Sequence, residues 1–200
     1  MSSTPQNADT ASIQPDYFNQ MYAANIDPWD FETSEYEAKK YAATIAALPK
    51  ETYRAGFEIG GSIGVLTEKL AARCQSLLSI DVSEQAQARA KARCKDLSHV
   101  EFEVMQVPHQ YPNRTFDLTL VSEVGYYWGK EDLQIAQQKI ADHLEPGGHL
   151  LLVHWTPYVD DYPLTGDEVH EAFLQTVGTT YQSLISRNDE RYRLDLLERL

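Results

Sequence analysis

Two hydrophobic patterns alternate along the middle of the chain. Short, nearly continuous apolar runs are typical of buried parallel strands, whereas apolar residues every three or four positions are typical of helices that pack one face on a sheet. Apolar runs predict strands at 55–59, 76–80, 100–105, 116–121 and 149–154. Helical spacing predicts helices at 64–73, 83–94 and 131–144. The alternation predicts an α/β protein with a doubly wound, Rossmann-like sheet.

The two ends of the chain complete this sheet and cover it. After a predicted helix at 167–177, strand candidates at 179–186 and 191–197 lie close together, which predicts an antiparallel last strand in a seven-stranded sheet. Residues 15–50 predict an N-terminal helical cap, in which Ser34 and Glu37 have the spacing of a capping box. We therefore expect a disordered tail at 1–14 and a single domain at 15–200, with a Rossmann-like core from residue 51.

Composition excludes several function classes. The net charge is -13 and no block of Lys or Arg is present, which disfavours a nucleic-acid partner. No apolar run approaches the roughly 20 residues that span a bilayer, and the first residues lack the signal-peptide pattern, so we expect a cytoplasmic protein without a membrane partner. Cys74 and Cys94 are expected on exposed or half-buried helices, and neither a disulfide framework nor a metal site is expected.

A glycine-rich turn follows the first core strand. Gly60 permits a tight turn, Gly61 and Ser62 keep large side chains away from a ligand, and Gly64 allows close packing of the next helix. The free amide groups at the start of that helix suit a polar ligand. Asp81 ends the next strand, where a carboxylate accepts hydrogen bonds from both hydroxyls of a ribose. The sequence therefore predicts a nucleoside site.

Two features indicate which nucleoside binds. The spacing from Gly60 to Gly64 is one residue shorter than in the dinucleotide fingerprint G-x-G-x-x-G, and Ser62 stands at the third position of that motif, where the fingerprint has a glycine. Glu58, just before the turn, would repel a pyrophosphate but suits a ligand with an amino group. We therefore expect S-adenosyl-L-methionine rather than NAD, with S-adenosyl-L-homocysteine as the product.

Further cofactor contacts are expected at the ends of neighbouring strands and in the cap. Gln106 has the position to read the adenine amino group, with Val107 against the ring, although an ordinary loop residue would look the same. Tyr22 and Trp29 form a candidate aromatic lid that gains cation–π attraction to a sulfonium, or they anchor the cap to the sheet.

Candidate groups for the methyl acceptor follow the fourth and fifth strands. Glu123 follows the fourth strand and His154 ends the fifth, so both are expected at the ligand edge of the sheet. Each also has a plain structural interpretation, as a helix cap for Glu123 and as a satisfied buried imidazole for His154. The remaining candidates for acceptor binding are Tyr126, Trp155, Asp161 and Tyr162.

Two other function classes remain open at this point. Residues 60–64 also match G-x-S-x-G, the nucleophile elbow of α/β-hydrolases, with Ser62 as the nucleophile. Its partners would be an acid, Asp117 or Asp161, and a base, His154 or His170. This alternative places the elbow on the first strand and gives Asp81 no role. The second alternative is a nucleotide-binding sensor that does not catalyse a reaction.

The chain resembles the class I methyltransferases that use S-adenosylmethionine, through Glu58 to Gly64, Asp81-Val82-Ser83, Phe116-Asp117-Leu118 and Leu144 to Gly148. Val82 belongs to the cofactor contacts that this resemblance implies. More narrowly it resembles the nodulation protein S group of N-methyltransferases, through 27–31, 36–41, 122–127, 154–155 and 161–167. The resemblance implies an amine acceptor, in rhizobia the free amine of a deacetylated chitooligosaccharide, or another amino sugar or small amine, and a monomer or homodimer.

These assignments predict distinct effects of two substitutions. If His154 removes the proton of the acceptor amine while Glu123 or Asp161 orients it, His154→Ala lowers the methylation rate with little change in cofactor affinity. Asp81→Ala does the reverse, because it removes the ribose contact. Calorimetry for cofactor affinity and a methyl-transfer assay check both, and equal loss of rate and affinity in His154→Ala would contradict the assignment of the base.

Overall fold

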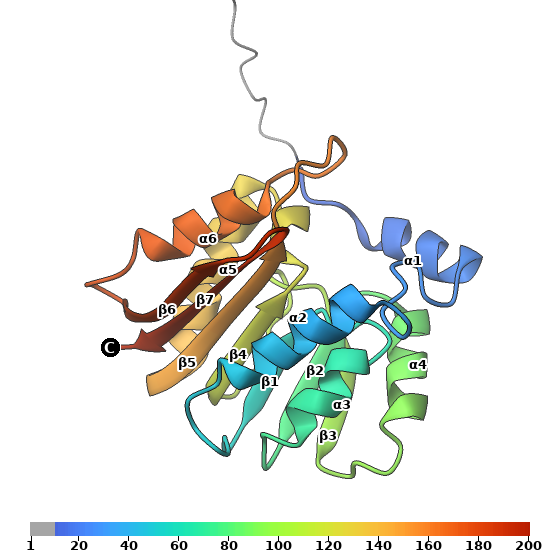
Figure 1. The fold of residues 1–200 in the computed structure, drawn as a ribbon, viewed down its shortest axis with the longest axis horizontal. Helices are drawn as coiled ribbons and strands as arrows, with labels where there is room; N and C mark the ends of the chain where they lie inside the picture. Colours follow the sequence, from blue (N-terminus) through green and yellow to red (C-terminus); the bar gives the residue numbers. More distant parts are fainter. Residues whose placement is uncertain (1–10) are drawn as a thin grey trace, which may run out of the picture.

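Seven strands form one sheet, and the predicted Rossmann-like architecture is confirmed in the computed structural model, which describes residues 11–200 (Figure 1). The strands are β1 (Gly56–Ile59), β2 (Leu77–Asp81), β3 (Val100–Val104), β4 (Phe116–Ser122), β5 (Leu144–Trp155), β6 (Tyr181–Asn188) and β7 (Tyr192–Arg199). Their order across the sheet is β3-β2-β1-β4-β5-β7-β6. Strands β1 to β5 are parallel, and β7 is antiparallel to both of its neighbours, as predicted.

Helices cover both faces of the sheet (Figure 1). They are α1 (Pro15–Ala24), α2 (Glu35–Ala46), α3 (Val65–Ala71), α4 (Glu84–Arg93), the 3-10 helix η1 (Gly125–Tyr127), α5 (Lys130–His143) and α6 (Gly166–Leu174). Helices α2 and α3 lie on the face toward the viewer, and α5 lies behind the sheet. None of the helices in the part of the chain that the structure describes is long and apolar enough to cross a membrane.

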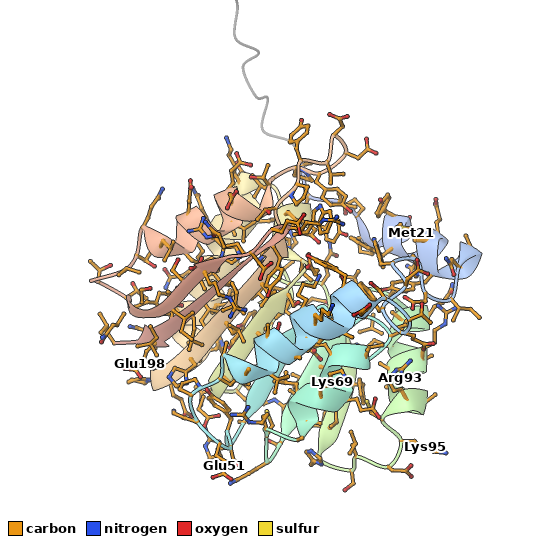
Figure 2. All side chains as sticks on the ribbon, in the orientation of Figure 1. Met21, Glu51, Lys69, Arg93, Lys95 and Glu198 are labelled. Atoms are coloured by element: carbon orange, nitrogen blue, oxygen red, sulfur yellow. The ribbon has the colours of Figure 1, made fainter. Side chains whose placement is uncertain are left out.

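The central strands are buried on both sides, which is why they appear as continuous apolar runs in the sequence. In β5, Leu151 and Val153 pack in the same cluster as residues of α2 and α3. Their neighbours Leu150 and Leu152 pack with residues of α5 and α6 on the opposite face. Successive side chains of a strand point to opposite faces, so one run supplies both cores. Charged side chains such as Glu51, Lys69 and Lys95 point outward (Figure 2).

Helix α2 begins at the predicted N-cap, but only one of the two hydrogen bonds of the predicted capping box forms. The Ser34 hydroxyl accepts a hydrogen bond from the Glu37 amide at 3.3 Å, as an N-cap does. The expected return bond from Glu37 is replaced, because the Glu37 carboxylate turns inward to Lys40 at 2.9 Å. A complete capping box forms instead at α6, between Thr165 and Glu168.

The cysteines and the N-terminal tail differ in part from what the sequence predicts. Cys74 and Cys94 are both buried, and Cys74 lies in the bridge to Tyr53 rather than on a helix, so their expected exposed or half-buried helical positions are wrong. Most of the predicted tail at 1–14 lies outside the described residues. Within its described part, the Ile13 amide donates to the Tyr127 carbonyl at 2.9 Å, and the Ser12 hydroxyl contacts Asp132.

Gly64 is required by both its backbone and its surroundings. Its φ is +82°, and a Cβ there would lie 2.9 Å from the Cα of Ala90, where α3 and α4 meet. We expect Gly64→Ala to lower the free energy of unfolding by about 2–3 kcal/mol, through backbone strain and overpacking together. The matched control is Gly147→Ala, since Gly147 has φ +72° and a Cβ that would meet nothing within 4 Å. Equal losses in urea denaturation would show that the helix contact is unimportant.

Candidate active site

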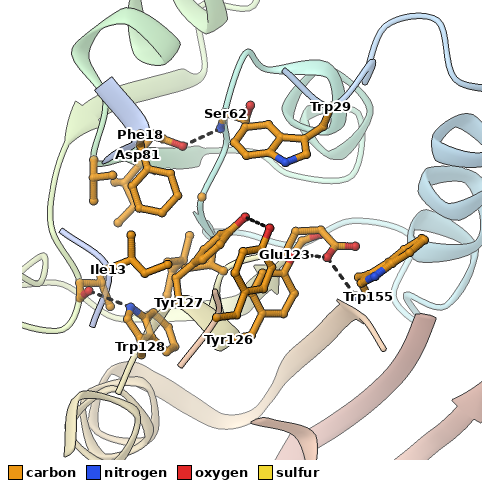
Figure 3. Close-up of a pocket in the computed structure, with 18 of the residues that line it drawn as sticks. Ile13, Phe18, Trp29, Ser62, Asp81, Glu123, Tyr126, Tyr127, Trp128 and Trp155 are labelled. Atoms are coloured by element: carbon orange, nitrogen blue, oxygen red, sulfur yellow. Dashed lines mark hydrogen bonds between the residues drawn. The ribbon is translucent and has the colours of Figure 1, made fainter. Parts of the chain in front are cut away.

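A cavity of about 330 Å³ opens at the carboxyl ends of the central parallel strands (Figure 3). Ile59 and Gly60 of the β1 end, Asp81 of the β2 end and Ser122 of the β4 end line it, and residues of α1 and α2 close it from the other side. Strands β1 and β4 are neighbours at the point where the chain order across the sheet reverses. Ligands of doubly wound sheets bind in the crevice at this point.

The glycine turn forms part of the cavity wall. Gly60 and Ser62 line the cavity with φ values of +83° and +50°. A Cβ on Gly60 would lie 2.0 Å from the Cγ2 of Val124, so only glycine fits beside the loop after β4. Gly61 does not line the cavity: its Cβ would lie 2.0 Å from the Ser79 hydroxyl. The expectation that Gly61 clears space for a ligand is therefore wrong, because it clears space for buried polar side chains.

Asp81 joins the turn to the second strand. Its Oδ2 accepts a hydrogen bond from the Ser62 amide at 3.0 Å (Figure 3), and its Oδ1 accepts one from the Ser83 amide at 2.9 Å. Burial disfavours the charged form and raises the pKa of Asp81 to about 6, although the amide hydrogen bonds act in the opposite direction. Asp81 thus faces the cavity and the glycine turn, as the sequence predicts.

Glu58 lies behind the turn rather than in the cavity. Its Oε2 accepts hydrogen bonds from the hydroxyls of Thr67, at 2.5 Å, and Ser79, at 2.7 Å. The side chain is buried, which raises its pKa, and it is absent from the cavity wall. The expected direct contact between Glu58 and a ligand amino group is therefore not supported. Its position supports α3 and β2 beneath Gly61.

The other expected cofactor residues all line the cavity: Val82, Gln106, Val107, Tyr22 and Trp29. Tyr22 is buried, and its hydroxyl lies 2.5 Å from the Ser62 hydroxyl. Burial and the neighbouring Asp81 raise the pKa of Tyr22, so it stays a neutral phenol. The rings of Tyr22 and Trp29 meet edge to face, and Trp29 stacks on Phe31. These aromatic residues therefore form a wall of the cavity and also hold one another in place.

Glu123 lies across the cavity from Asp81, beside Tyr126 and Trp155 (Figure 3). Its φ of +56° turns the chain sharply after β4. The Glu123 Oε2 accepts hydrogen bonds from the Tyr126 hydroxyl at 2.6 Å and the Trp155 amide at 2.9 Å. Tyr162 also lines the cavity and stacks on Tyr126 with ring centroids 5.0 Å apart. These residues form an acidic, aromatic half of the cavity.

Lys40 and Glu37 complete this half, and the sequence analysis missed both as site residues. Lys40 Nζ is 2.5 Å from Glu123 Oε1 and 2.9 Å from Glu37 Oε1, with only 2% of its side chain exposed. Burial lowers the pKa of Lys40, but the two carboxylates outweigh burial and raise it above its ordinary value. The helical spacing contains a signal for them, because Lys40 and Glu37 share the helix face of the buried Tyr41 and Thr44. Unpaired charges are costly on such a face, so the two residues are expected to have charged partners.

His154 is sealed beneath the cavity. Its Nε2 accepts from the Gly125 amide at 3.0 Å, so its proton sits on Nδ1 and is donated to His170 Nε2 at 3.0 Å. His170 Nδ1 in turn donates to Asp195 Oδ2 at 2.5 Å. Burial lowers the pKa of His154 far below its usual range, and neighbouring positive charge adds to this. His154 does not line the cavity, so its assignment as the base is wrong.

Asp161 is exposed and also absent from the cavity wall, so the structure does not support its assignment as an acceptor residue. The hydrolase alternative fails on the same geometry. The Ser62 hydroxyl is paired with Tyr22, while Asp117 accepts from the amides of Arg54 and Ala55. His154 and His170 are hydrogen-bonded to each other, so neither is available to Ser62.

Comparison with known proteins decides the family. The model of the nodulation protein S (NodS) family matches residues 15–155, which is more than half of the chain. This chain belongs to the NodS family. NodS of Rhizobium tropici is 34% identical over 135 residues, which cover 66% of this chain and 56% of that protein. NodS of Sinorhizobium fredii is 33% identical over 129 residues, covering 62% and 59%. The chain thus matches little more than half the length of these NodS relatives.

Solved structures confirm the class I methyltransferase fold of this NodS-family chain. A candidate methyltransferase from Pseudomonas syringae has a TM-score of 0.72 and 37% identity, and the match covers 83% of this chain and all of that one. The N-methyltransferase NodS from Bradyrhizobium japonicum, in complex with S-adenosyl-L-homocysteine, has a TM-score of 0.82 at 23% identity. That match covers 94% of this chain and 99% of the other.

The structure predicts that His154 is needed for folding rather than for proton transfer. We expect His154→Ala to lower the free energy of unfolding by about 3 kcal/mol, because it leaves the Gly125 amide and His170 without partners and opens a cavity. His109→Ala is the control: this imidazole is 56% exposed and pairs with Asp132, so its loss costs under about 0.5 kcal/mol. A fully stable His154→Ala protein without activity would restore the base assignment.

Proposed function

We propose that this chain is an S-adenosyl-L-methionine-dependent methyltransferase that methylates an amine nitrogen of a small molecule or amino sugar. The observation that carries the proposal is the junction of Asp81 with the glycine turn in the wall of the cavity. Membership of the NodS family supports the same conclusion. In this proposal residues 15–200 act as one unit, with 15–50 as the cap over the cofactor.

The residues of the cavity fit this cofactor. Each carboxylate oxygen of Asp81 accepts one amide hydrogen bond and keeps acceptor capacity, so the carboxylate suits the two hydroxyls of a ribose. The apolar side chains of Ile80, Val82 and Met105 line the same region and suit an adenine ring. Tyr22 and Trp29 present aromatic surface, which suits a sulfonium. S-adenosyl-L-homocysteine is the product in this proposal.

The opposite half of the cavity supports an amine rather than an anionic acceptor. Glu37, Lys40 and Glu123 together carry one net negative charge when ionised, so they attract a cation and repel a carboxylate or phosphate. The stacked rings of Tyr126 and Tyr162 beside them offer a face to a sugar ring or an alkyl chain. Glycan and small-amine acceptors are both consistent with these contacts.

The bound cofactor supplies an electrophilic methyl group on a positively charged sulfur. The protein contributes mainly by positioning and by excluding water from the cavity. Asp81 and the glycine turn hold the nucleoside end, while Glu123 and the aromatic residues orient the acceptor nitrogen. Lys40 holds the Glu123 carboxylate in place, because its ammonium contacts Glu123 Oε1 at 2.5 Å.

Asp81→Asn tests the cofactor site and predicts opposite effects on binding and stability. Affinity for S-adenosyl-L-homocysteine should fall at least tenfold in calorimetry. At pH 7.5 the free energy of unfolding should rise by about 1 kcal/mol, because the folded-state pKa of about 6 lies above the ordinary value of 3.8 and the ionised carboxylate therefore opposes folding. Part of this gain is offset because the Asn amide accepts only one of the two backbone hydrogen bonds. This gain should shrink as the pH falls through about 6, where the folded-state carboxyl becomes protonated, and disappear below 3.8, where the unfolded-state carboxyl is protonated as well. Unchanged affinity would contradict the ribose assignment.

An acceptor screen separates an enzyme from a sensor that only binds the cofactor. Transfer of a labelled methyl group is measured to glucosamine oligosaccharides, their fully N-acetylated forms and simple primary amines. We expect transfer to free amines and none to the acetylated sugars. Cofactor binding without transfer to any amine would favour the sensor.

A further inference from the structure

We propose that Glu37 receives the ammonium group of the methyl acceptor and takes its proton before methyl transfer. This inference rests on the proposed function and assigns a role to a residue of the cap helix α2. Its basis is the arrangement of Glu37, Lys40 and Glu123, which we call the charge triad. The triad joins α2 to the turn after β4 in the wall of the cavity.

The hydrogen bonds of the charge triad leave one acceptor position open. Both oxygens of Glu123 already have partners, because Oε1 contacts Lys40 and Oε2 accepts from Tyr126 and from the Trp155 amide. Glu37 Oε1 contacts Lys40 at 2.9 Å, whereas the buried Glu37 Oε2 receives no hydrogen bond of normal geometry. The Tyr41 hydroxyl lies near this carboxylate and lowers its pKa, but it does not complete such a bond. A buried carboxylate oxygen without a partner is costly, and a ligand donor would remove this cost.

The remaining polar groups of the cavity are poor proton acceptors. Lys40 is an ammonium whose pKa is raised by its two carboxylates after the opposing effect of burial, so it has no lone pair to offer. Tyr126 is a neutral phenol that already donates to Glu123. Asp132 contacts Ser12 and His109, and Asp81 binds the glycine turn. Burial also raises the pKa of Glu37 above its usual range, which makes it a better base than an exposed glutamate.

The proton and electron balance of the step is simple. The acceptor enters as a primary ammonium and pairs with the ionised triad, which becomes neutral overall. One N–H proton passes to Glu37 Oε2, and the freed nitrogen lone pair forms the bond to the methyl carbon. The carbon–sulfur bond breaks with its electron pair on sulfur, so the sulfonium becomes a neutral thioether. The product leaves as a methylated ammonium, and Glu37 returns its proton to solvent.

The test uses sinefungin, an analogue of S-adenosyl-L-homocysteine that carries a primary amine in place of the transferable methyl group. This probe places an ammonium near the acceptor position whatever the natural acceptor is. We expect calorimetry to show that the wild-type protein binds sinefungin at least tenfold more tightly than S-adenosyl-L-homocysteine. Glu37→Gln should bring this ratio to within about threefold of one, and Glu37→Asp should restore part of it.

The matched control is Glu35→Gln, which makes the same change on the same helix. Glu35 pairs with Lys39 and its side chain is 83% exposed, so the affinity ratio should stay at its wild-type value. A wild-type ratio near one, or a ratio that Glu37→Gln leaves unchanged, overturns the proposal. Loss of S-adenosyl-L-homocysteine binding in Glu37→Gln overturns it as well, because Glu37 would then serve the cofactor or the fold.

The pH dependence of the affinity ratio gives a second readout. Protonated Glu37 has no charge to offer an ammonium, so the ratio should fall toward one as the pH drops through the raised pKa of Glu37. The groups facing Glu37 are Lys40, Tyr36 and Tyr41 from α2 and Glu123 from the turn after β4. Titration of Asp81 affects both ligands equally and cancels. A pH-independent ratio above ten contradicts the proposal, whereas a wild-type protein that binds neither ligand contradicts the proposed function instead.

Discussion

The hydrogen bond between the Asp81 carboxylate and the Ser62 amide is the constraint on which the site depends. It ties the end of β2 to the turn after β1 and so fixes the backbone that faces the cavity. The same contact keeps a carboxylate where burial raises its pKa to about 6, so the ligand-free fold carries a local cost. Binding sites commonly contain such destabilised groups, since a ligand supplies the missing interactions.

Across the cavity, a second set of buried charges has a different function. Lys40 holds two carboxylates from separate elements, so α2 is fixed to the turn after β4 by ions rather than by apolar packing alone. Buried ion pairs add little net stability, but they specify geometry, because removing one partner leaves an uncompensated charge. The cavity therefore has acidic groups on both sides, with Asp81 beside the glycine turn and the charge triad between the cap and the turn after β4.

The sequence was sufficient for the sheet and for half of the site. Continuous apolar runs, glycine spacing and Asp81 are local signals, and each lies where the motif predicts. Lys40 and Glu37 were not predicted as site residues, because the sequence does not show whether a charged residue on a helix faces inward until its partner is known. For His154 the position near the end of β5 was predicted correctly, but the direction of its side chain was not: it points into the protein beneath the cavity. Glu58 and Asp161 were misassigned because proximity in sequence to a motif does not give side-chain direction.

The imidazole pair links four elements that are distant in sequence: η1 with Gly125, β5 with His154, α6 with His170 and β7 with Asp195. These hydrogen bonds connect the C-terminal hairpin to the part of the cavity wall that carries Tyr126, and within residues 11–200 no side-chain hydrogen bond joins the hairpin to the turn after β1. A substitution in α6 or β7 can therefore reach the cavity wall at Tyr126 through buried side chains, whereas the turn after β1 is held by its own hydrogen bond to Asp81.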